Sequence, residues 1–422
     1  MSLTKISPSS LQGVLEIPPS KSHTLRAILF ATLASGRSVI RNYLHSPDTD
    51  AMIRACHLMG AEIAVWDDTL EITGGIKMTE DVIHAGNSGQ VLRFVGAVSA
   101  LMPGYTIITG DHSIRQLRPV QPLIEGLNQL GAFAVSAKGN GFAPLIVRGP
   151  LKGGTALVNG EDSQPISALL IASAFAPEKS EIFVTNPGEK PWVKLTLSWF
   201  DRLGISYQNE SFEKYEIAGG STVSGFDFTV PTDLSSASYP IAAAVITGSE
   251  LLLKNVIFDE SQGDIEVIFQ LKRMGGKIEF DHKAGEIRVL KGSKLKAAKI
   301  DVNNFIDGIT LLSVVGCYAE GITEIVGGKI ARSKESDRIA SIVAELKKMG
   351  AKIHEKEDGV IVEHSHLTGA ALESYSDHRM AMSLAIAALG AQGPSAIEGA
   401  QCVRKSFPPF FEALKSVGAK IE

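Results

Sequence analysis

Basic side chains gather where helices of this sequence are expected to begin. Lys21, Arg93 and Arg379 each follow closely on a Ser, Asn or Asp, the residue types that cap helix N-termini. The first helical turn has unpaired N–H groups and a partial positive charge, so it favours bound anions. One such residue alone is more often a solvated surface group, but basic residues beside four separate segments favour sites for phosphate and carboxylate groups. The full set is Lys21, Arg26, Arg93, Arg118, Lys334, Arg338, Arg379 and Lys405.

An approximate pattern, apolar-Gly-Ala-x-apolar, recurs through the chain and indicates repeated structural units. Its glycines lie about 70 residues apart, which fits one βαβαββ unit per repeat. Each pattern follows an amphipathic stretch, so the glycine suits the position just after a helix, and an alternating strand is expected next. The glycines are Gly60, Gly131, Gly204, Gly275, Gly350 and Gly418.

Each repeat also contains a second helix that is much more apolar and opens with polar residues. Helices this apolar are buried on all sides, and their Ser, Asn or Asp starts are good caps. Six of them predict an α/β fold of two similar three-repeat domains, with helices inside and sheets outside. A repeat solenoid is the alternative architecture, but solenoid helices usually keep one face in solvent. The six helices are expected to start near residues 20, 87, 163, 235, 307 and 377.

The bulk composition excludes several classes of protein. At 422 residues the chain is too long for one core, and 44% hydrophobic with 21% charged residues is typical of a folded globular protein. A net charge of −5 argues against nucleic-acid binding. The three cysteines are widely spaced, which favours a reducing compartment over a disulfide framework or a zinc site. Neither a signal peptide nor a membrane-length apolar run is found, so we expect a cytoplasmic protein without membrane association or bound metal.

Eight segments, in order along nearly the whole chain, resemble motifs of the EPSP synthase family of 3-phosphoshikimate 1-carboxyvinyltransferases. The opening segment reads P-S-K-S-H-T-L-R-A at 19–27, and a short loop reads G-N-S-G at 86–89. Later segments read K-E-S-D-R at 334–338 and D-H-R-M-A-M at 377–382. Each motif alone is a weak signal, but eight in the same order make the resemblance specific. The other four lie at 110–119, 233–239, 262–264 and 405–408.

The resemblance implies two similar domains, each a three-fold pseudo-symmetric inside-out α/β barrel of βαβαββ repeats. Residues 20–232 would form the first domain, and residues 1–19 together with 233–422 the second, with crossover hinges near 19–20 and 232–233. The active site would lie in the cleft between the domains, whose closure would exclude water and align the substrates. A monomer is expected.

The resemblance also implies the reaction. The family transfers the enolpyruvyl (carboxyvinyl) group of phosphoenolpyruvate to the 5-hydroxyl of shikimate 3-phosphate and releases phosphate, in the biosynthesis of chorismate and the aromatic amino acids, with no cofactor. On this basis Asp307 would be the base for the hydroxyl, unless it is only a helix cap, and Glu335 would transfer a proton at the vinyl carbon. Lys21, Lys334 and His378 complete the catalytic set that the resemblance implies.

Two overlapping sets of residues would bind the two small-molecule substrates. Guanidinium groups suit the phosphoenolpyruvate anions because they hold planar oxyanions bidentately, and a glycine lets the backbone approach the ligand. The phosphoenolpyruvate set is Lys21, Gly89, Arg118, Gln164, Arg338, Arg379 and Lys405. The shikimate 3-phosphate set is Lys21, Ser22, Arg26, Ser163, Gln164, Asp307 and Lys334. Gly89 also predicts sensitivity to glyphosate, the family's inhibitor at the phosphoenolpyruvate site.

Several positions on the shikimate side depart from the family pattern. Asp162 and Glu189 stand where the family has Ser, Trp192 where it has Tyr, and Ile330 where it has Asn. An acid near a phosphate is repulsive unless a base such as Lys190 pairs with it. One alternative function is therefore transfer to UDP-N-acetylglucosamine, although those enzymes usually carry a reactive Cys in the loop corresponding to 111–118, where this chain has none. An inactive, anion-binding paralogue is the other alternative.

Overall fold

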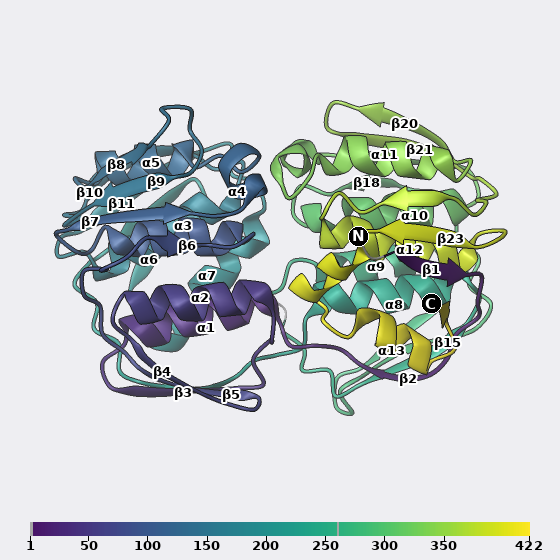
Figure 1. The fold of residues 1–422 in the computed structure, drawn as a ribbon, viewed down its shortest axis with the longest axis horizontal. Helices are drawn as coiled ribbons and strands as arrows, with labels where there is room; N and C mark the ends of the chain where they lie inside the picture. The colour runs from purple at the N-terminus through teal and green to yellow at the C-terminus, as the bar shows by residue number, and fades with distance from the viewer. Residues whose placement is uncertain (1–2, 260) are drawn as a thin grey trace. The chain divides into compact units, whose positions relative to one another are not determined.

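The computed structural model describes residues 3–259 and 261–422. The chain divides into two compact units, one of Pro19–Val230 and one that combines Met1–Pro18 with Pro231–Glu422. We call them the 19–230 unit and the terminal unit. Both consist of helices and mixed sheets (Figure 1), so the α/β class expected from the sequence is confirmed. Among the helices that the structure describes, none is both long and apolar enough to cross a membrane.

The sheets of the 19–230 unit share one plan. In each, an edge strand runs parallel to its neighbour, and two antiparallel strands complete the sheet. Its described sheets have the orders β14(Asp227–Thr229)-β3(Arg37–Arg41)-β5(Thr69–Thr73)-β4(Glu62–Trp66), β6(Ile83–His84)-β7(Tyr105–Thr109)-β9(Leu145–Arg148)-β8(Phe133–Ser136) and β10(Gly154–Asn159)-β11(Ser180–Thr185)-β13(Lys214–Ile217)-β12(Tyr207–Glu210).

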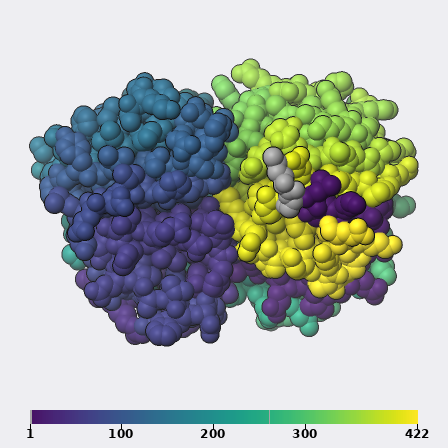
Figure 2. Space-filling view, viewed as in Figure 1, coloured from purple at the N-terminus to yellow at the C-terminus, as the bar shows by residue number. Residues whose placement is uncertain are grey.

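The terminal unit repeats the same plan with strands from both ends of the chain. The first strand pairs with two strands near the C-terminus, with Leu3 opposite Glu398 and Ile6 opposite Ile421. Figure 2 shows these first residues, in dark purple, beside the yellow C-terminal segment. The described sheets are β22(Ala371–Glu373)-β23(Ser395–Glu398)-β1(Leu3–Ser7)-β24(Lys420–Ile421), β2(Gln12–Glu16)-β15(Glu250–Lys254)-β17(Glu286–Val289)-β16(Ile278–Asp281) and β18(Lys299–Asp301)-β19(Ile322–Val326)-β21(Gly359–Glu363)-β20(Lys352–Lys356).

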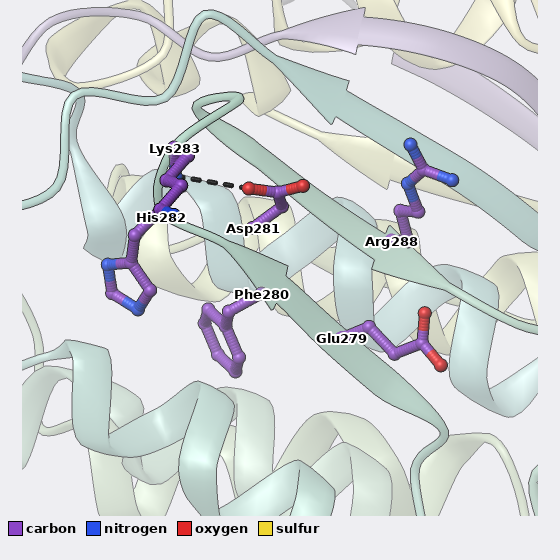
Figure 3. A pocket seen from close by; sticks show the side chains of 6 residues that line it. All are labelled: Glu279, Phe280, Asp281, His282, Lys283 and Arg288. Atoms are coloured by element: carbon purple, nitrogen blue, oxygen red, sulfur yellow. Dashed lines mark hydrogen bonds between the residues drawn. The ribbon is translucent and has the colours of Figure 1, made fainter.

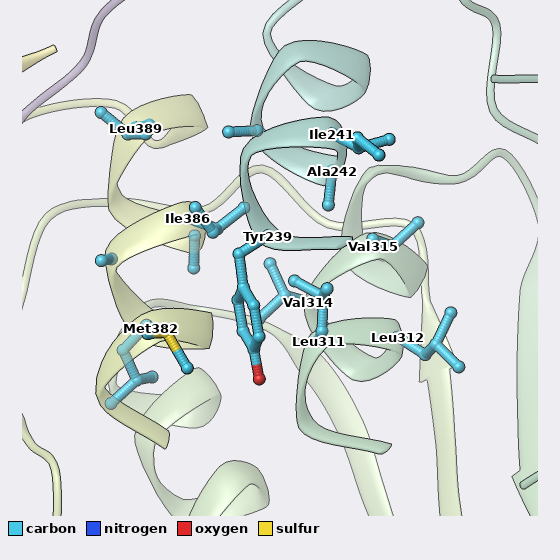
Figure 4. Close-up of a cluster of buried hydrophobic side chains, with 14 of the residues drawn as sticks. Tyr239, Ile241, Ala242, Leu311, Leu312, Val314, Val315, Met382, Ile386 and Leu389 are labelled. Atoms are coloured by element: carbon cyan, nitrogen blue, oxygen red, sulfur yellow. The ribbon is translucent and has the colours of Figure 1, made fainter. Parts of the chain in front are cut away.

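The apolar helices expected to be buried are buried. In the 19–230 unit they are α1(Lys21–Leu33), α3(Gly89–Ser99) and α6(Ser163–Phe175), and every residue of α3 is buried. In the terminal unit they are α8(Leu234–Ile246), α10(Ile309–Tyr318) and α12(His378–Gly390). Figure 4 shows Tyr239 of α8 packed among Leu311 and Val314 of α10 and Met382 and Ile386 of α12. Removing these apolar side chains from water stabilises each unit. Because the central helices are packed in the core, the position of each helix's first turn is fixed.

The remaining helices are less completely buried than the central ones. Each glycine of the recurring pattern has a positive φ, between 68° and 110°, and lies at or just after a helix end, as expected. In the 19–230 unit these helices are α2(Pro47–Leu58), α4(His112–Gln116), α5(Gln121–Gln129) and α7(Lys190–Leu203). In the terminal unit they are α9(Ile265–Arg273), η1(Ile306–Gly308), η2(Lys329–Ser333), α11(Arg338–Lys348), η3(Ala400–Lys405) and α13(Phe410–Ser416).

Candidate active site

The guanidinium of Arg338 is the centre of a buried charge cluster in the terminal unit. Arg338 opens α11 and is 1% exposed. Its Nη1 donates to Asp307 Oδ1 at 2.6 Å, its Nη2 to Glu335 Oε2 at 2.8 Å, and its Nε to Asp377 Oδ2 at 2.8 Å. The neighbouring carboxylates raise the pKa of Arg338 well above its usual value despite the opposing effect of burial. One cation thus brings together both acids that the sequence proposed for proton transfer.

Asp307 is held as an ionised carboxylate. Burial favours its neutral form, but the charges of Arg338, Arg379 and Lys334 outweigh burial and lower its pKa below the usual range. Arg379 Nη2 donates to Asp307 Oδ2 at 3.3 Å. Asp307 lies inside η1, and neither η1 nor α10 has a side-chain cap bond, so the interpretation of Asp307 as a helix cap is wrong. Asp307 is therefore ionised near neutral pH.

Glu335 lies among donors from three elements. Lys405, at the end of η3, donates from Nζ to Glu335 Oε1 at 2.5 Å, and Arg338 holds the other oxygen. His378, the first residue of α12, places Nδ1 3.9 Å from the same Oε1. The side chain of Glu335 is only 7% exposed. The carboxylate of Glu335 thus lies out of bulk water beside an ammonium group and an imidazole.

Asp264 is a member of this cluster that the sequence analysis did not name as a site residue. The Ser235 hydroxyl donates to its Oδ2, and Arg379 Nη2 lies 3.8 Å from that oxygen. Burial, followed by the charge of Asp307, raises the pKa of Asp264 from 3.8 to about 7. The sequence signal was the motif at 262–264, whose aspartate received no role because burial cannot be seen in a motif.

In the 19–230 unit the start of α3 brings several expected ligand-binding residues together. A Cβ atom on Gly89 would lie 2.5 Å from Arg118 Nη1, 2.8 Å from Arg93 Nη1 and 3.1 Å from Gln164 Oε1. Any side chain at Gly89 would therefore displace these groups. Arg93 donates to Gln164 Oε1 at 2.8 Å and forms an ion pair with Asp162 at 3.0 Å. This arrangement forms a compact basic group beside the N-terminus of a buried helix.

Lys21 and Arg26, both on α1, have different environments. Lys21 opens the helix, with Nζ 3.5 Å from Asp48 Oδ2. The Arg26 side chain is buried, and it donates to Thr196 Oγ1 at 3.0 Å and to the Trp192 carbonyl at 3.2 Å. Burial lowers the pKa of Arg26 to about 9. In this structure Arg26 therefore ties α1 to α7, a structural role that its expected place in the shikimate 3-phosphate set did not include.

The carboxylates of the acidic departures Asp162 and Glu189 lie at the start of α6, although Glu189 itself directly precedes α7. Asp162 caps α6 by accepting the Gln164 N–H at 3.1 Å. Glu189, in the left-handed region with φ 45°, accepts both the N–H and the hydroxyl of Ser163 at 3.1 Å. The expected base Lys190 instead places its ammonium 5.9 Å from the centre of the Phe212 ring. Carboxylates of the chain itself therefore accept the first two N–H groups of α6.

The other two departures are explained by packing. Trp192 and Ile330 are partly buried hydrophobic side chains packed against the core of their respective units. The remaining expected residues lie with the groups already described: Lys334 precedes Glu335 at the end of η2, and Ser22 lies in the first turn of α1, where its carbonyl accepts from Arg26.

A surface hollow outside these groups lies on the hairpin of β16 and β17. It is lined by Glu279, Phe280, Asp281, His282, Lys283 and Arg288, and the Lys283 N–H donates to Asp281 Oδ1 at 3.0 Å (Figure 3). None of its lining residues belongs to the Arg338 cluster or to the group around Gly89. Within residues 3–259 and 261–422, no cluster of three or more His, Cys, Asp or Glu is arranged to hold a metal ion.

The raised pKa of Asp264 predicts a specific pH dependence of stability. The folded protein retains a proton on Asp264 that the unfolded chain releases above its pKa of 3.8, so this group destabilises the fold increasingly as pH rises from about 4 to about 7. Asp264→Asn has no charge to bury. Its free energy of unfolding relative to wild type should therefore increase across that interval, as measured by urea titration at several pH values. Asp281→Asn, an exposed aspartate of the same unit, is the matched control. A difference for Asp264→Asn that is independent of pH would contradict the burial argument.

Comparisons with known proteins agree with the motif evidence. The family model for EPSP synthase (3-phosphoshikimate 1-carboxyvinyltransferase) matches residues 6–414. Among curated proteins, the 3-phosphoshikimate 1-carboxyvinyltransferase of Acetivibrio thermocellus is 42% identical over 99% of both chains. That of Chlamydia caviae is 41% identical over 99% of this chain and 94% of its own.

A solved structure gives the same result. An EPSP synthase from Acinetobacter baumannii superimposes with a TM-score of 0.83 and 29% sequence identity, covering 100% of this chain and 99% of its own. Sequence likeness and structural likeness therefore both extend over nearly the full length of this chain. The chain belongs to the EPSP synthase family of 3-phosphoshikimate 1-carboxyvinyltransferases.

Proposed function

We propose that this chain transfers the enolpyruvyl group of phosphoenolpyruvate to the 5-hydroxyl of shikimate 3-phosphate, with release of phosphate. The observation that carries this assignment beyond family membership is the Arg338 cluster. Asp307 and Glu335 bond to different N–H groups of one guanidinium, so a change of protonation on either acid alters the charge felt by the other. Such coupling suits a reaction in which one proton is removed while another is delivered.

The reaction divides into two steps for which these residues supply the proton transfers. Asp307 removes the proton of the attacking hydroxyl while C3 of phosphoenolpyruvate gains a proton from Glu335, and the hydroxyl oxygen bonds to C2. The resulting intermediate then returns a proton from C3 to the carboxylate of Glu335, and the C2–O bond to phosphate breaks. The departing phosphate takes the proton that Asp307 removed from the hydroxyl, which restores both acids to their starting states. Lys405 and His378, which lie beside Glu335, stabilise its ionised form and the departing anion.

The group around Gly89 would supply anion binding for the same reaction. Arg118, Arg93 and the first turn of α3 offer guanidinium and N–H donors, which suit a carboxylate or a phosphate. Lys21, Gln164, Arg379 and Lys405 are proposed to complete the phosphoenolpyruvate contacts. Gly89 supports the further proposal that glyphosate competes at this position, because a side chain there would displace Arg118.

The finer architecture is part of the same proposal. Among the described residues, each unit has three sheets of one plan and three buried helices, which supports a three-fold pseudo-symmetric inside-out barrel. The chain is proposed to act in the cytoplasm, an assignment supported by free Cys56, Cys317 and Cys402. It is also proposed to act as a monomer.

Phosphate release tests the function directly. Purified protein is given phosphoenolpyruvate with shikimate 3-phosphate, and separately with UDP-N-acetylglucosamine. Release with the first acceptor alone is the expected result. Release with UDP-N-acetylglucosamine alone would assign the alternative acceptor, and no release with either would favour an anion-binding paralogue.

The two acids should be separately essential for turnover. Asp307→Asn and Glu335→Gln retain the shape of each side chain but remove its ability to accept a proton, so each should lower kcat by roughly 10²–10⁴-fold, the usual contribution of a positioned acid or base. Steady-state kinetics measure the loss, and circular dichroism checks folding. Glu357→Gln, an acid of the same unit with a side chain 85% exposed, is the matched control and should retain wild-type kcat. Near-normal turnover of either acid variant would remove that residue from the mechanism.

Glu189 should affect the acceptor rather than the donor. Glu189→Gln preserves an oxygen for the Ser163 hydroxyl but removes a negative charge that opposes a phosphate. We expect KM for shikimate 3-phosphate to fall by roughly three- to tenfold, equivalent to about 0.6–1.4 kcal/mol, with KM for phosphoenolpyruvate unchanged. A rise in KM for the acceptor would instead mean that the carboxylate itself binds it.

A further inference from the structure

A strained turn lies directly before the charged start of α12. Tyr375 and Ser376 both have φ 54°, a left-handed conformation that non-glycine residues seldom adopt, here at two successive positions. The next three residues are Asp377, His378 and Arg379, all members of the Arg338 cluster or its surroundings. Such a conformation persists only where surrounding contacts enforce it, and it recurs at functional sites. The residues that enforce the left-handed conformation of Tyr375 and Ser376 are therefore residues on which the site depends.

Ser374 accepts the N–H groups of Ser376 and Asp377 within the turn. Glu345 on α11 supplies the contacts from outside the turn. Its side chain is fully buried, although glutamate is rarely buried without partners. One oxygen accepts the Tyr375 hydroxyl at 2.8 Å, and the other accepts the Glu373 N–H at 2.9 Å. Lys348 Nζ, at 2.7 and 2.9 Å, supplies a positive charge from the solvent side. The buried carboxylate of Glu345 thus has polar partners on both oxygens. It binds the turn itself through Tyr375 and the end of the preceding strand through Glu373.

The same helix also holds the other end of the turn. Arg338, which binds Asp377, lies at the start of α11, and Glu345 lies two turns further along on the same face. Two residues of α11 therefore hold the segment 373–377. Glu345 accepts from Glu373 and Tyr375, and Arg338 donates to Asp377. Burial and the charge of Glu345 raise the pKa of Tyr375 to about 12, so its hydroxyl remains a donor at any working pH.

We propose that Glu345 and Tyr375 are positioning residues of the transferase site. Their bond holds the left-handed turn, which sets the place of Asp377 and thereby the direction in which Arg338 presents its N–H groups to Asp307 and Glu335. Neither residue belongs to the expected substrate-binding sets, so each would act through its neighbours. The inference rests on the proposed function for its kinetic consequence, but its structural part concerns the unliganded protein alone.

Tyr375→Phe removes only the hydroxyl and is the first test. We expect kcat to fall by about tenfold, up to about 10²-fold, because small misplacement of catalytic groups is costly, while KM for both substrates changes less than threefold. Tyr318→Phe is the matched control: its hydroxyl donates at 2.8 Å to the Ala387 carbonyl near the far end of α12. That variant should lose comparable stability and retain kcat within twofold. Equal kcat losses in the two variants would reduce Tyr375 to a stabilising residue and overturn the proposal.

Amide hydrogen exchange provides a readout that does not need activity. In Tyr375→Phe without ligand, the amides of residues 373–379 should exchange at least tenfold faster than in wild type, whereas Tyr318→Phe should leave them unchanged. Glu345→Gln should also accelerate this exchange. The neutral side-chain carboxamide of Gln is not attracted to the Lys348 ammonium as the Glu345 carboxylate is. Unchanged exchange at 373–379 in both Tyr375→Phe and Glu345→Gln would overturn the proposal even for an active enzyme. If exchange is accelerated in the variants but the wild-type protein has no transferase activity, the structural role of Glu345 and Tyr375 stands and the proposed function is rejected.

Discussion

The buried guanidinium of Arg338 is the interaction on which the terminal unit's chemistry depends. Two buried carboxylates and a third that is partly exposed cannot lie this close together unless a cation compensates for their charges. Arg338 does so with a separate N–H group for each of Asp307, Glu335 and Asp377. Because each carboxylate comes from a different segment, the same bonds also fix three elements relative to one another. Stability of this region and readiness for proton transfer therefore have one origin.

Two aspartates near Arg338 have pKa values shifted in opposite directions by their neighbours. Asp307 faces three cations, which keep it ionised, whereas Asp264 is more deeply buried and has a pKa near 7. The two aspartates influence each other as well as Arg379, so protonation is shared among neighbours rather than assigned to isolated groups. An ionised acceptor beside a group that titrates near neutrality gives the cluster two charge states in the physiological range.

Helix N-termini are used in contrasting ways within the 19–230 unit. At α3 the absence of a side chain on Gly89 leaves guanidinium groups close to the backbone, in a form suited to an incoming anion. At α6 the carboxylates of Asp162 and Glu189 already accept the first N–H groups. Ser163 donates its hydroxyl proton to Glu189 and keeps its lone pairs. The same local feature thus favours an anion in one case and a hydrogen-bond donor in the other.

The sequence alone determined the α/β class, the repeated units and the buried central helices, because hydrophobic period, helix caps and glycine positions act over a few residues. It also brought Gly89, Asp307, Glu335 and Arg338 into consideration, through motifs that resemble a family. Only the tertiary structure decided which charges meet. Asp307 and Asp377 lie 31 and 39 residues from Arg338 along the chain, and the roles of Arg26 and Glu189 likewise depend on neighbours from α7 and α6. Burial and Coulomb interactions are set by distance in space, so no local pattern could have revealed the pKa of Asp264 or the anchor between Glu345 and Tyr375.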